Sequence, residues 1–391
     1  MRIGIDAREL CGRPTGVGRY LAGLLRQWAL DERARRHEFI LYAPEAIGIE
    51  LDTRRFAARV IAGAAGTWWE QMQLPPIANA DRLDVFFAPA YTAPIRLKTP
   101  VVLAIHDVSY LAHPEWFAMR EGVRRRWLTR VAAERARVIT TLSAFSKREI
   151  LEHLSVPEAK VRIIVPGIDA PRVDSSVARL KPSRYDDVAT RSAQSFSDHD
   201  VVARRLQPSG GDARVLYVGS IFNRRHIPDL IRALGVLAER RPTVSLDIVG
   251  DNRTFPREDI ARDVAAQGLN DRVRWHQYVP DEQLRSLYAR ARTFAFLSEY
   301  EGLGLPPLEA LAVNVPPVVG DTPVAHESCG DAAVYTPVDD ATSIARALER
   351  ALFDDDVRTG VLAAAPVTLA RYSWPRAARE TLAALEDAAH R

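Results

Sequence analysis

The sequence lacks most of the features that assign a protein to a class at first sight. Among its 391 residues are two cysteines, Cys11 and Cys329, whose spacing fits no metal site, so we expect reduced thiols inside the cell. No run of about 18 apolar residues occurs, so no transmembrane helix is predicted. The opening residues, MRIGIDAREL, are charged and lack the apolar core of a signal peptide. These absences predict a cytoplasmic protein.

The chain also lacks a large excess of charge of either sign. It has 53 Lys and Arg against 50 Asp and Glu, a formal net charge of +3, so we expect no nucleic-acid partner. With 47% hydrophobic and 26% charged residues, the composition is that of a globular protein. The length exceeds that of one hydrophobic core and, at roughly 100–200 residues a domain, predicts two domains.

Short apolar segments alternate with helical patterns along most of the chain. In the first half we expect strands at 2–7, 38–43, 84–90, 101–107, 137–143 and 161–167, with helices at 18–30, 115–135 and 144–154. In the second half we expect strands at 214–220, 244–251, 273–279, 293–298 and 315–320, with helices at 227–239, 257–267, 281–290, 306–313 and 340–352. Apolar strands linked by helices indicate parallel sheets covered on both faces. The sequence therefore predicts an α/β protein with two doubly wound sheets.

A polar stretch rich in Ser, Asp and Arg separates the two halves. A structureless segment of this length is uncommon inside one domain. We therefore predict domains at 1–170 and 214–373, joined by a linker at 171–213. The DHD triplet at 198–200 falls in this linker, away from any strand end, and is not interpreted as a metal site.

The stretch SEYEGLGLPPLEAL, residues 298–311, combines two carboxylates with bare backbone. It follows an expected strand, and ligands of open parallel sheets bind at the carboxyl ends of strands. Gly302 and Gly304 let backbone amides approach a ligand, and the prolines that follow suit the first turn of a helix. Such amides favour a diphosphate, while Glu301 and Glu309 can hold ribose and sugar hydroxyls. The alternative is that both glutamates only complement the helix dipole.

Two adjacent arginines follow the first expected strand of the second domain. Arg224 and Arg225 lie in GSIFNRRHI, residues 219–227, directly before an expected helix. Fixed cations at this place can neutralise a leaving diphosphate without a metal ion. The alternative is a pair of solvated surface arginines.

The first domain offers weaker candidates at its strand ends. Gly16 and Gly18 resemble a phosphate-approach loop, but the third glycine of the dinucleotide fingerprint is missing, and a tight turn explains them equally well. His106 and Asp107 follow another expected strand. A lone histidine is more often structural than catalytic, but this position favours a role in the site.

Together these residues resemble the family 4 glycosyltransferases, which retain the anomeric configuration and have the GT-B architecture. The most specific element is the Glu-x7-Glu motif from Glu301 to Glu309, and Arg224 with Arg225 corresponds to the family's Arg-Lys pair. WWEQMQLP and IHDVSYLAHPEWF look most like bacterial mannosyltransferases of polysaccharide assembly. Asn314 replaces the glycine expected after the motif helix.

The resemblance implies two Rossmann-like domains facing across a cleft, with a final helix, 374–391, that crosses back onto the first domain. It implies that Glu301 acts near the reacting centre of the donor sugar and that Glu309 holds the ribose. Arg224 and Arg225 would bind the diphosphate, and His106 would orient the sugar. The remaining donor-binding positions would be Gly16, Gly18, Val279, Gly302, Leu303 and Gly304.

We therefore expect a retaining, metal-independent glycosyltransferase of cell-surface polysaccharide synthesis. It would move a hexose, mannose from GDP-mannose, to a lipid-linked or saccharide acceptor, with no cofactor beyond this donor. Two alternatives are a sugar-nucleotide epimerase of similar fold and a non-catalytic subunit that binds nucleotide sugars. The paired glutamates and paired arginines favour the transferase.

The expected helix around 116–138 is unusually basic. Val123, Trp127 and Val131 recur every four positions among its arginines. One interpretation buries this apolar stripe and leaves the arginines in solvent. The other places the helix on anionic lipid headgroups at the inner face of the cell membrane, where a lipid-linked acceptor would lie.

Overall fold

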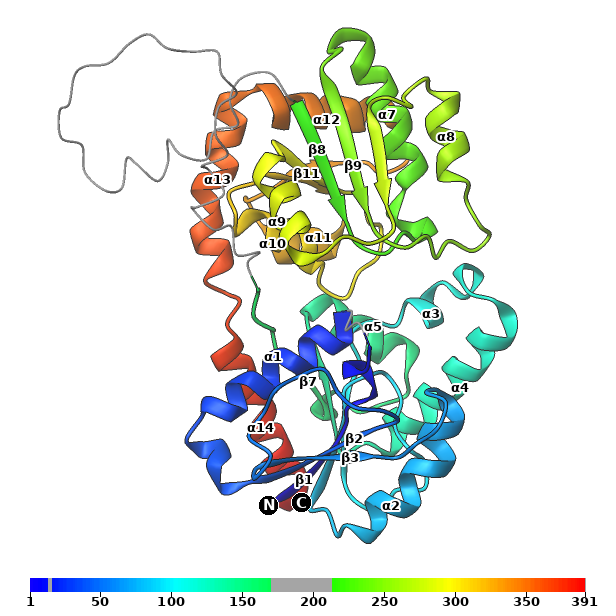
Figure 1. Cartoon of the computed structure of the whole chain (residues 1–391), viewed down its shortest axis with the longest axis vertical. Helices are drawn as coiled ribbons and strands as arrows, with labels where there is room; N and C mark the ends of the chain where they lie inside the picture. The colour runs from blue at the N-terminus through cyan, green and yellow to red at the C-terminus, as the bar shows by residue number, and fades with distance from the viewer. Residues whose placement is uncertain (13–15, 170–212, 391) are drawn as a thin grey trace, which may run out of the picture. The chain divides into compact units, whose positions relative to one another are not determined.

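The computed structural model describes residues 1–12, 16–169 and 213–390 and divides into two compact units (Figure 1). Unit 1 consists of Met1–Ile168, Tyr300–Gly304 and Ala370–Arg391, and unit 2 of Asp169–Glu299 and Leu305–Leu369. The expected linker and its DHD triplet lie outside the described residues, except for Ala213, which begins the first strand of unit 2.

The seven-stranded sheet of unit 1 is parallel, in the order β3-β2-β1-β4-β5-β6-β7. Its strands are β1 (Arg2–Asp6), β2 (Glu38–Ala43), β3 (Phe56–Val60), β4 (Val85–Ala88), β5 (Val101–Ala104), β6 (Val138–Thr141) and β7 (Val161–Ile163). The strand order reverses between the neighbours β1 and β4, which makes their carboxyl ends the expected ligand site of this sheet.

Helices cover both faces of this sheet. One face carries α1 (Gly16–Leu30) packed against α14 (Trp374–His390), and α14 contacts β4, β5 and β6. The other face buries a core under the π-helix η3 (Trp69–Gln73), α2 (Leu74–Ala80), α4 (Met119–Arg135) and α5 (Ala144–His153). The short helix α3 (Ser109–Ala112) precedes α4.

The last helix, α14, is fixed to unit 1 by large side chains. Trp28 donates its indole N–H to the carbonyl of Ala378 over 2.9 Å. The ring of Trp374 lies so close to Gly23 that an added Cβ there would meet it at 2.6 Å. The bare backbone of Gly23 therefore permits the close approach of α14 to α1.

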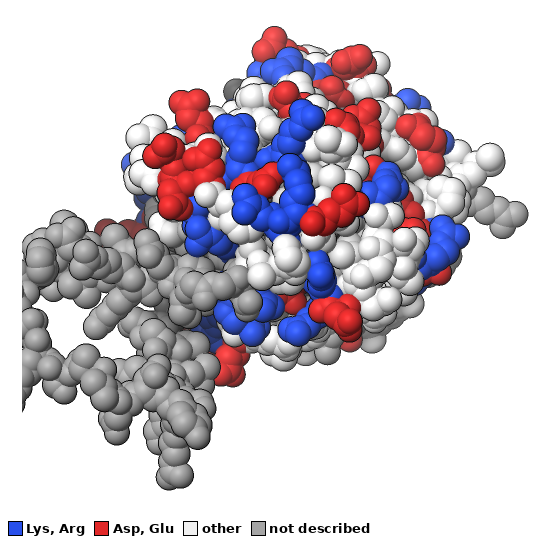
Figure 2. All heavy atoms as spheres, turned by 90° about the horizontal axis from the view of Figure 1, so that it is seen from above, with Lys and Arg blue, Asp and Glu red and all other residues white. Residues whose placement is uncertain are grey.

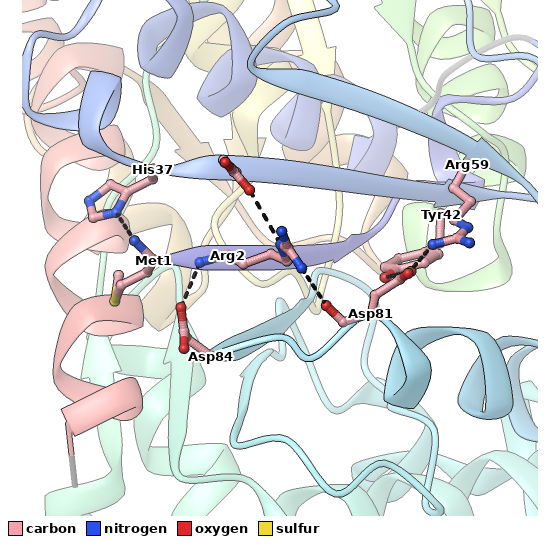
Figure 3. A network of polar contacts seen from close by, with 8 residues as sticks. Met1, Arg2, His37, Tyr42, Arg59, Asp81 and Asp84 are labelled. Atoms are coloured by element: carbon pink, nitrogen blue, oxygen red, sulfur yellow. Dashed lines mark hydrogen bonds and ion pairs between the residues drawn. The ribbon is translucent and has the colours of Figure 1, made fainter.

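A polar network links several strands of unit 1 (Figure 3). The backbone N–H of Arg2 donates to Asp84 over 2.7 Å, and its guanidinium donates to the carbonyl of Asp81 over 2.9 Å. The Asp81 carboxylate accepts from Tyr42 over 2.7 Å and pairs with Arg59. Exposed ion pairs of this kind contribute little stability each, about 0–1 kcal/mol. The network extends from Arg2, at the amino end of β1, to Tyr42 and Arg59 near the carboxyl ends of β2 and β3.

Unit 2 repeats the architecture with a six-stranded parallel sheet in the order β10-β9-β8-β11-β12-β13. Its strands are β8 (Ala213–Val218), β9 (Val244–Val249), β10 (Val273–His276), β11 (Thr293–Phe296), β12 (Pro317–Gly320) and β13 (Val334–Thr336). Its helices are η7 (Asn223–Arg225), α7 (Ile227–Arg240), α8 (Ile260–Ala266), α9 (Asp281–Arg290), α10 (Leu305–Leu311), α11 (Pro323–Cys329), α12 (Ala341–Phe353) and α13 (Asp355–Leu369). Here the strand order reverses between β8 and β11.

The predicted fold class, two doubly wound parallel sheets, is confirmed in both units. The helix expected at 115–135 is wrong at its start, because extended backbone at Phe117 separates a 3-10 turn, η4 (Pro114–Trp116), from α4. Asn314 takes the left-handed conformation, with φ of 61°, that a glycine would take after α10. Its substitution for glycine therefore leaves the helix end unchanged.

Helix α4 contradicts the interpretation in which its apolar stripe is buried. Val123 is 53% exposed and Trp127 59% exposed, and Met119 on the same stripe is 82% exposed. The buried residues on the face of α4 that packs on unit 1 are Leu128, Thr129, Ala132 and Ala133, of which all but Leu128 are small. Small residues allow the helix to lie close to the sheet, and this turns the larger apolar side chains outward.

Candidate active site

Unit 2 presents two buried cations at the carboxyl end of β8. Arg224 and Arg225 are each 9% exposed, which excludes the alternative of two solvated surface arginines. The guanidinium of Arg224 lies 4.5 Å from the Phe222 ring centroid, and that of Arg225 lies 4.9 Å from the Phe296 ring centroid. Arg225 also donates to the carbonyl of Ser220 over 2.7 Å. Buried guanidinium groups held in fixed positions are able to bind an anion with little rearrangement.

The arginine loop is braced on one side by Asn223. Its amide nitrogen donates to the carbonyl of Pro256 over 3.1 Å and to the carboxylate of Glu258 over 2.8 Å. Its amide oxygen accepts from the N–H of Phe255 over 2.6 Å. Asn223 thus ties the arginine loop to the segment after β9.

The other side of the arginine loop is tied to the segment after β11. The N–H of Glu299 donates to the carbonyl of Arg224 over 3.0 Å. His226 lies 3.1 Å from a carboxylate oxygen of Asp229 and 3.4 Å from one of Glu299. Sequence reasoning missed both Asn223 and His226, although they flank the arginines directly.

The segment Tyr300–Gly304, which carries the first part of the Glu-x7-Glu motif, belongs to unit 1. The carbonyl of Gly302 accepts from the hydroxyl of Ser143 over 2.5 Å, and the hydroxyl of Ser146 lies 2.9 Å from it. A Cβ added to Gly302 would meet the carbonyl oxygen of His106 at 2.0 Å. Glycine is therefore required at this position by packing alone, before any ligand is considered.

Tyr300 anchors the same segment and was not singled out from the sequence. Its hydroxyl donates to the carboxylate of Glu149 over 3.0 Å. Its ring packs edge-on against Phe145 and His113, with centroids 5.3 and 5.5 Å apart. The two serines and this tyrosine hold the backbone on both sides of Glu301, which is itself half-buried.

Glu309 lies in unit 2, on α10, and is half-buried. Pro306 and Pro307 occupy the first turn of this helix as expected, where no N–H donor is needed. Gly304, with φ of 79°, makes the turn into the helix. The two glutamates of the motif therefore belong to different units, and the chain passes from one unit to the other between them.

His106 follows β5 and is 7% exposed. Its Nε2 lies 2.9 Å from the carbonyl of Pro89, so this nitrogen carries the proton and donates. Tyr20 packs edge-on to the ring at 4.7 Å. Burial lowers the pKa of His106, more than the Pro89 contact and Asp107 raise it. The imidazole is therefore a neutral group that can orient a ligand rather than a charged one.

Unit 1 holds a buried polar cluster at the carboxyl end of β1 that the sequence did not reveal. Arg8 lies 3.2 Å from Asp6 and 2.7 Å from Glu70, and Thr92 donates to Glu70 over 2.7 Å. Burial raises the pKa of Asp6 to about 6, against the opposing effect of Arg8. The sequence did offer a signal for this cluster, because Asp6 ends the first strand and Arg8 follows it.

The remaining expected donor-binding residues differ in what they can offer. Gly16 is exposed at the first residue of α1, whereas Gly18 is buried within its first turn. Leu303 is 4% exposed and Val279, in unit 2, is 5% exposed. The buried side chains of Leu303 and Val279 leave mainly backbone groups for a ligand.

Other kinds of site were sought in the same residues. Within the described ranges, no group of three or more His, Cys, Asp or Glu side chains could hold a metal ion. The helices of the described residues include none that is long and apolar enough to cross a bilayer. On the face seen in Figure 2, basic and acidic side chains are interspersed, without a broad area of one sign.

Comparison with known proteins defines the class. The family model described as "Glycosyltransferase Family 4" matches residues 14–172, and the model described as "Glycosyl transferases group 1" matches residues 200–365. These matches identify a glycosyltransferase. They favour it over the two alternatives, the sugar-nucleotide epimerase and the non-catalytic subunit. The chain belongs to the family 4 glycosyltransferases.

The chain is 27% identical over 300 residues to O-antigen chain mannosyltransferase B of Escherichia coli, across 76% of this chain and 73% of that protein. It is 27% identical over 287 residues to alpha-D-kanosaminyltransferase of Streptomyces kanamyceticus, across 71% and 68%. The crystal structure of Anabaena HepE in complex with UDP and glucose has a TM-score of 0.72 at 17% identity, covering 99% of this chain and 100% of that chain. WaaG, a glycosyltransferase involved in lipopolysaccharide biosynthesis, has a TM-score of 0.71 at 16% identity, covering 98% and 99%. These structural likenesses establish the GT-B fold.

Proposed function

We propose that this glycosyltransferase transfers mannose from GDP-mannose to a lipid-linked or saccharide acceptor during cell-surface polysaccharide synthesis, with retention of configuration and without a metal ion. The observation that carries the proposal is the buried pair Arg224 and Arg225 at the strand reversal of unit 2. Mannose as the sugar is supported by the similarity to O-antigen mannosyltransferases of Escherichia coli and Salmonella typhimurium.

In this proposal Arg224 and Arg225 bind the diphosphate of the donor. Charge accumulates on the diphosphate as the bond to the sugar breaks, and fixed cations in a water-poor site stabilise that charge. A divalent cation performs this task in many other transferases, and here the two guanidinium groups would replace it. The backbone amides of Gly302, Leu303 and Gly304 would add hydrogen bonds to the same group.

The two glutamates would divide the donor between them. Glu309 would accept hydrogen bonds from the ribose hydroxyls, and Glu301 would contact the transferred sugar near its anomeric carbon. His106, neutral because of its burial, would orient sugar hydroxyls. Gly16 and Gly18 would line the site near the phosphate and acceptor, and Val279 would contribute through its backbone.

Retention would follow from attack on the same face as departure. The acceptor hydroxyl forms its bond to the anomeric carbon while the bond from that carbon to the diphosphate oxygen breaks. The proton of the hydroxyl passes to the departing diphosphate, so no carboxylate nucleophile is needed. Closure of the protein around the substrates would exclude the water that otherwise hydrolyses the donor.

The exposed stripe of α4 supports attachment to an anionic membrane at its inner face. At about 100° per residue, Met119, Val123 and Trp127 fall within one sector of roughly 80°. On the same geometry Arg126 lies about 20° outside this sector, and Arg130, further along the helix, lies inside it. Exposed apolar side chains flanked by arginines match the interface of a bilayer with anionic headgroups. Such attachment would bring a lipid-linked acceptor to the enzyme.

The donor is tested by calorimetric titration of the full chain with GDP-mannose, GDP, UDP-glucose, UDP and ADP-glucose. We expect GDP-mannose and GDP to bind most tightly. Transfer from GDP-mannose to membrane extracts in the presence of EDTA, followed by NMR of the product, should give the α-anomer. A preference for a UDP-sugar would replace the donor in the proposal, and a β-linked product would overturn retention.

A further inference from the structure

The carboxyl edge of the unit 2 sheet carries an exposed ring to which the proposed function gives no role. Phe255 follows β9 and is 49% exposed. Phe353, on α12, is also partly exposed, at 36%, but the guanidinium of Arg241 lies 4.7 Å from its ring centroid. Among the described residues, no aromatic ring or guanidinium covers Phe255 in this way. One exposed apolar side chain is common on protein surfaces, so exposure alone assigns Phe255 no function.

The backbone that carries Phe255 is fixed on both sides of the ring. The N–H of Phe255 donates to the amide oxygen of Asn223 over 2.6 Å. The hydroxyl of Thr254 donates to Asn252 over 2.7 Å and accepts from the N–H of Glu258 over 2.8 Å. Functional side chains are commonly carried by loops that a rigid scaffold holds in place. These bonds fix the loop in a conformation that leaves its phenylalanine half in solvent.

The loop after β9 lies directly against the loop after β8. A Cβ added to Gly250 would meet the carbonyl oxygen of Gly219 at 1.9 Å, so the two loops touch backbone to backbone where they leave the sheet. Further along, Ile221 donates its N–H to the carbonyl of Asp251 over 2.8 Å, and Asn223 reaches the backbone of the exposed phenylalanine. A ligand bound at the carboxyl ends of β8 and β9 would therefore lie against both loops and within reach of the exposed ring.

The chemistry of this loop restricts the part of a ligand that it can bind. The amide groups of Asn223 and Asn252 and the hydroxyl of Thr254 make their hydrogen bonds within the two loops. The side chain that remains at this turn is the apolar ring of Phe255. A nucleobase has a flat π-face that stacks on an aromatic side chain, whatever its pattern of donors and acceptors. A phosphate or a sugar requires polar partners instead.

We propose that Phe255 stacks on the nucleobase of the sugar nucleotide and so contributes to the choice of nucleotide. The juxtaposition that carries this inference is a half-exposed ring on a braced loop, beside the loop that the proposed function places against the donor. A purine has two fused rings and covers more of an aromatic side chain than a pyrimidine does, so this contact favours GDP-mannose over a UDP-sugar. The inference rests on the proposed function, because it concerns the nucleotide of the same donor.

The test compares four substitutions by calorimetric titration of the full chain with GDP and with UDP. Phe255→Ala removes the ring, Phe255→Leu keeps an apolar side chain without a π-face, and Phe255→Tyr keeps the π-face. We expect Phe255→Ala to weaken the binding of GDP about 10-fold and that of UDP about 3-fold, and Phe255→Leu to weaken that of GDP about 5-fold. Phe255→Tyr should bind GDP within about 2-fold of the native chain. Phe353→Ala, on α12, is the matched control and should bind both nucleotides within about 2-fold.

Steady-state kinetics and thermal unfolding separate stacking from a structural role. The base is remote from the sugar carbon that reacts, so Phe255→Ala should raise the KM for GDP-mannose about 10-fold and leave kcat within about 2-fold. Because the ring is half exposed and its loop is held by the contacts of Asn223, Asn252 and Thr254, the melting temperature of Phe255→Ala should match the native value. A lowered melting temperature together with weak binding would assign Phe255 to the packing of the loop and overturn the inference.

Native-like GDP binding by Phe255→Ala would overturn it as well. A raised KM for the acceptor with unchanged GDP binding would have the same consequence, because the ring would then contact the acceptor. If Phe255→Tyr weakens GDP binding as strongly as Phe255→Ala, stacking is not the cause. If the native chain binds neither GDP nor UDP, the proposed function fails and the inference fails with it. Tighter native binding of UDP than of GDP changes the donor in the proposed function alone, since Phe255→Ala still measures stacking on either base.

Discussion

In unit 1 Arg8 lies against the carboxylates of Asp6 and Glu70 beside the carboxyl end of β1, whereas in unit 2 Arg224 and Arg225 are buried at the carboxyl end of β8. The two sheets have the same doubly wound architecture. The strand order reverses between β1 and β4 in unit 1 and between β8 and β11 in unit 2. The two units also differ in the charge of a histidine at their strand ends. Burial lowers the pKa of His106 in unit 1, whereas the carboxylates of Asp229 and Glu299 raise the pKa of His226 in unit 2. The fold provides the position, and the side chains decide which ligand each edge accepts.

The proposed function uses this difference by placing the anionic part of the donor against unit 2 and its hydroxyl groups against unit 1. Fixed guanidinium groups suit a diphosphate, and carboxylates accept hydrogen bonds from sugar hydroxyls. The segment Tyr300–Gly304 belongs to unit 1, because the chain leaves unit 2 after Glu299 and returns to it at Leu305. The predictions below test this division, beginning with the largest expected effect.

The largest effect is expected when either buried arginine of unit 2 is removed. Arg224→Ala or Arg225→Ala should lower the rate of transfer by one to two orders of magnitude, about 1.4–3 kcal/mol of transition-state stabilisation. Arg240→Ala, at an arginine 56% exposed on the end of α7, is the matched control and should leave the rate unchanged. Steady-state kinetics with and without EDTA measures both effects. Loss of activity in EDTA, restored by magnesium or manganese, would show that the arginines do not replace a metal.

The two motif glutamates should separate binding from chemistry, since they belong to different units. Glu309→Gln should raise the KM for the donor about 10-fold with little change in kcat. Glu301→Gln should lower kcat about 10-fold or more even at saturating donor, because its contact is made near the reacting carbon. Equal and small effects of both variants on kcat and KM would support the alternative that these glutamates only complement the helix dipole.

The sequence could single out candidate positions, because a strand end followed by glycines or arginines is a local pattern. Arg224, Gly302 and the proline turn of α10 were selected in this way, and the structure places them after the strands that the sequence predicted. The brace of Asn223 and the anchoring of Gly302 by Ser143 were not, because they join segments 33 and 159 residues apart. No local periodicity encodes such contacts.

The fold shows the same limit. The alternation of buried strands and helices predicted both sheets, but β3 (FAARV) was missed because it is an edge strand in which only Phe56 is buried. Helix α13 was also missed, since Pro366 interrupts its pattern. Of the two interpretations of the helix at 116–138, the one that buried its apolar stripe failed, because large apolar side chains usually face the core and here mostly Ala and Thr do.

Two glycines test whether the motif segment is held by unit 1. Gly302→Ala places a Cβ 2.0 Å from the carbonyl of His106, so the segment must shift, and we expect a loss of at least about 10-fold in kcat together with a lower melting temperature. Gly16→Ala is the control, because no atom lies within 4 Å of an added Cβ there. The melting temperature of Gly16→Ala should match the native value, and a raised KM for the donor would reveal a ligand close to this backbone. A native melting temperature and kcat for Gly302→Ala would contradict the anchoring.

The smallest expected effect is on membrane binding. It tests whether the exposed surface of α4 in unit 1 binds anionic lipid while the surface of unit 2 does not. Each Lys or Arg near an anionic bilayer contributes about 1 kcal/mol, so the arginines of α4 should give weak, salt-sensitive binding. We expect the native chain to sediment with vesicles of anionic lipid at low salt and not with neutral vesicles. Arg124, Arg126 and Arg130 to Ser should abolish this, and Val123 and Trp127 to Ser should weaken it at unchanged charge.

Arg125 is left intact in these variants because its guanidinium lies over the rings of Tyr110 and Phe117, at 5.7 and 5.9 Å from their centroids. The charge-matched control is Arg240, Arg262 and Arg274 to Ser, three exposed arginines of unit 2. If this control loses binding as strongly as the α4 variant, net charge rather than the α4 surface attracts the membrane. If the native chain does not bind anionic vesicles, α4 is not a membrane-binding surface. If the native chain forms a dimer that the Val123 and Trp127 to Ser variant abolishes, the exposed stripe contacts another copy of the chain instead.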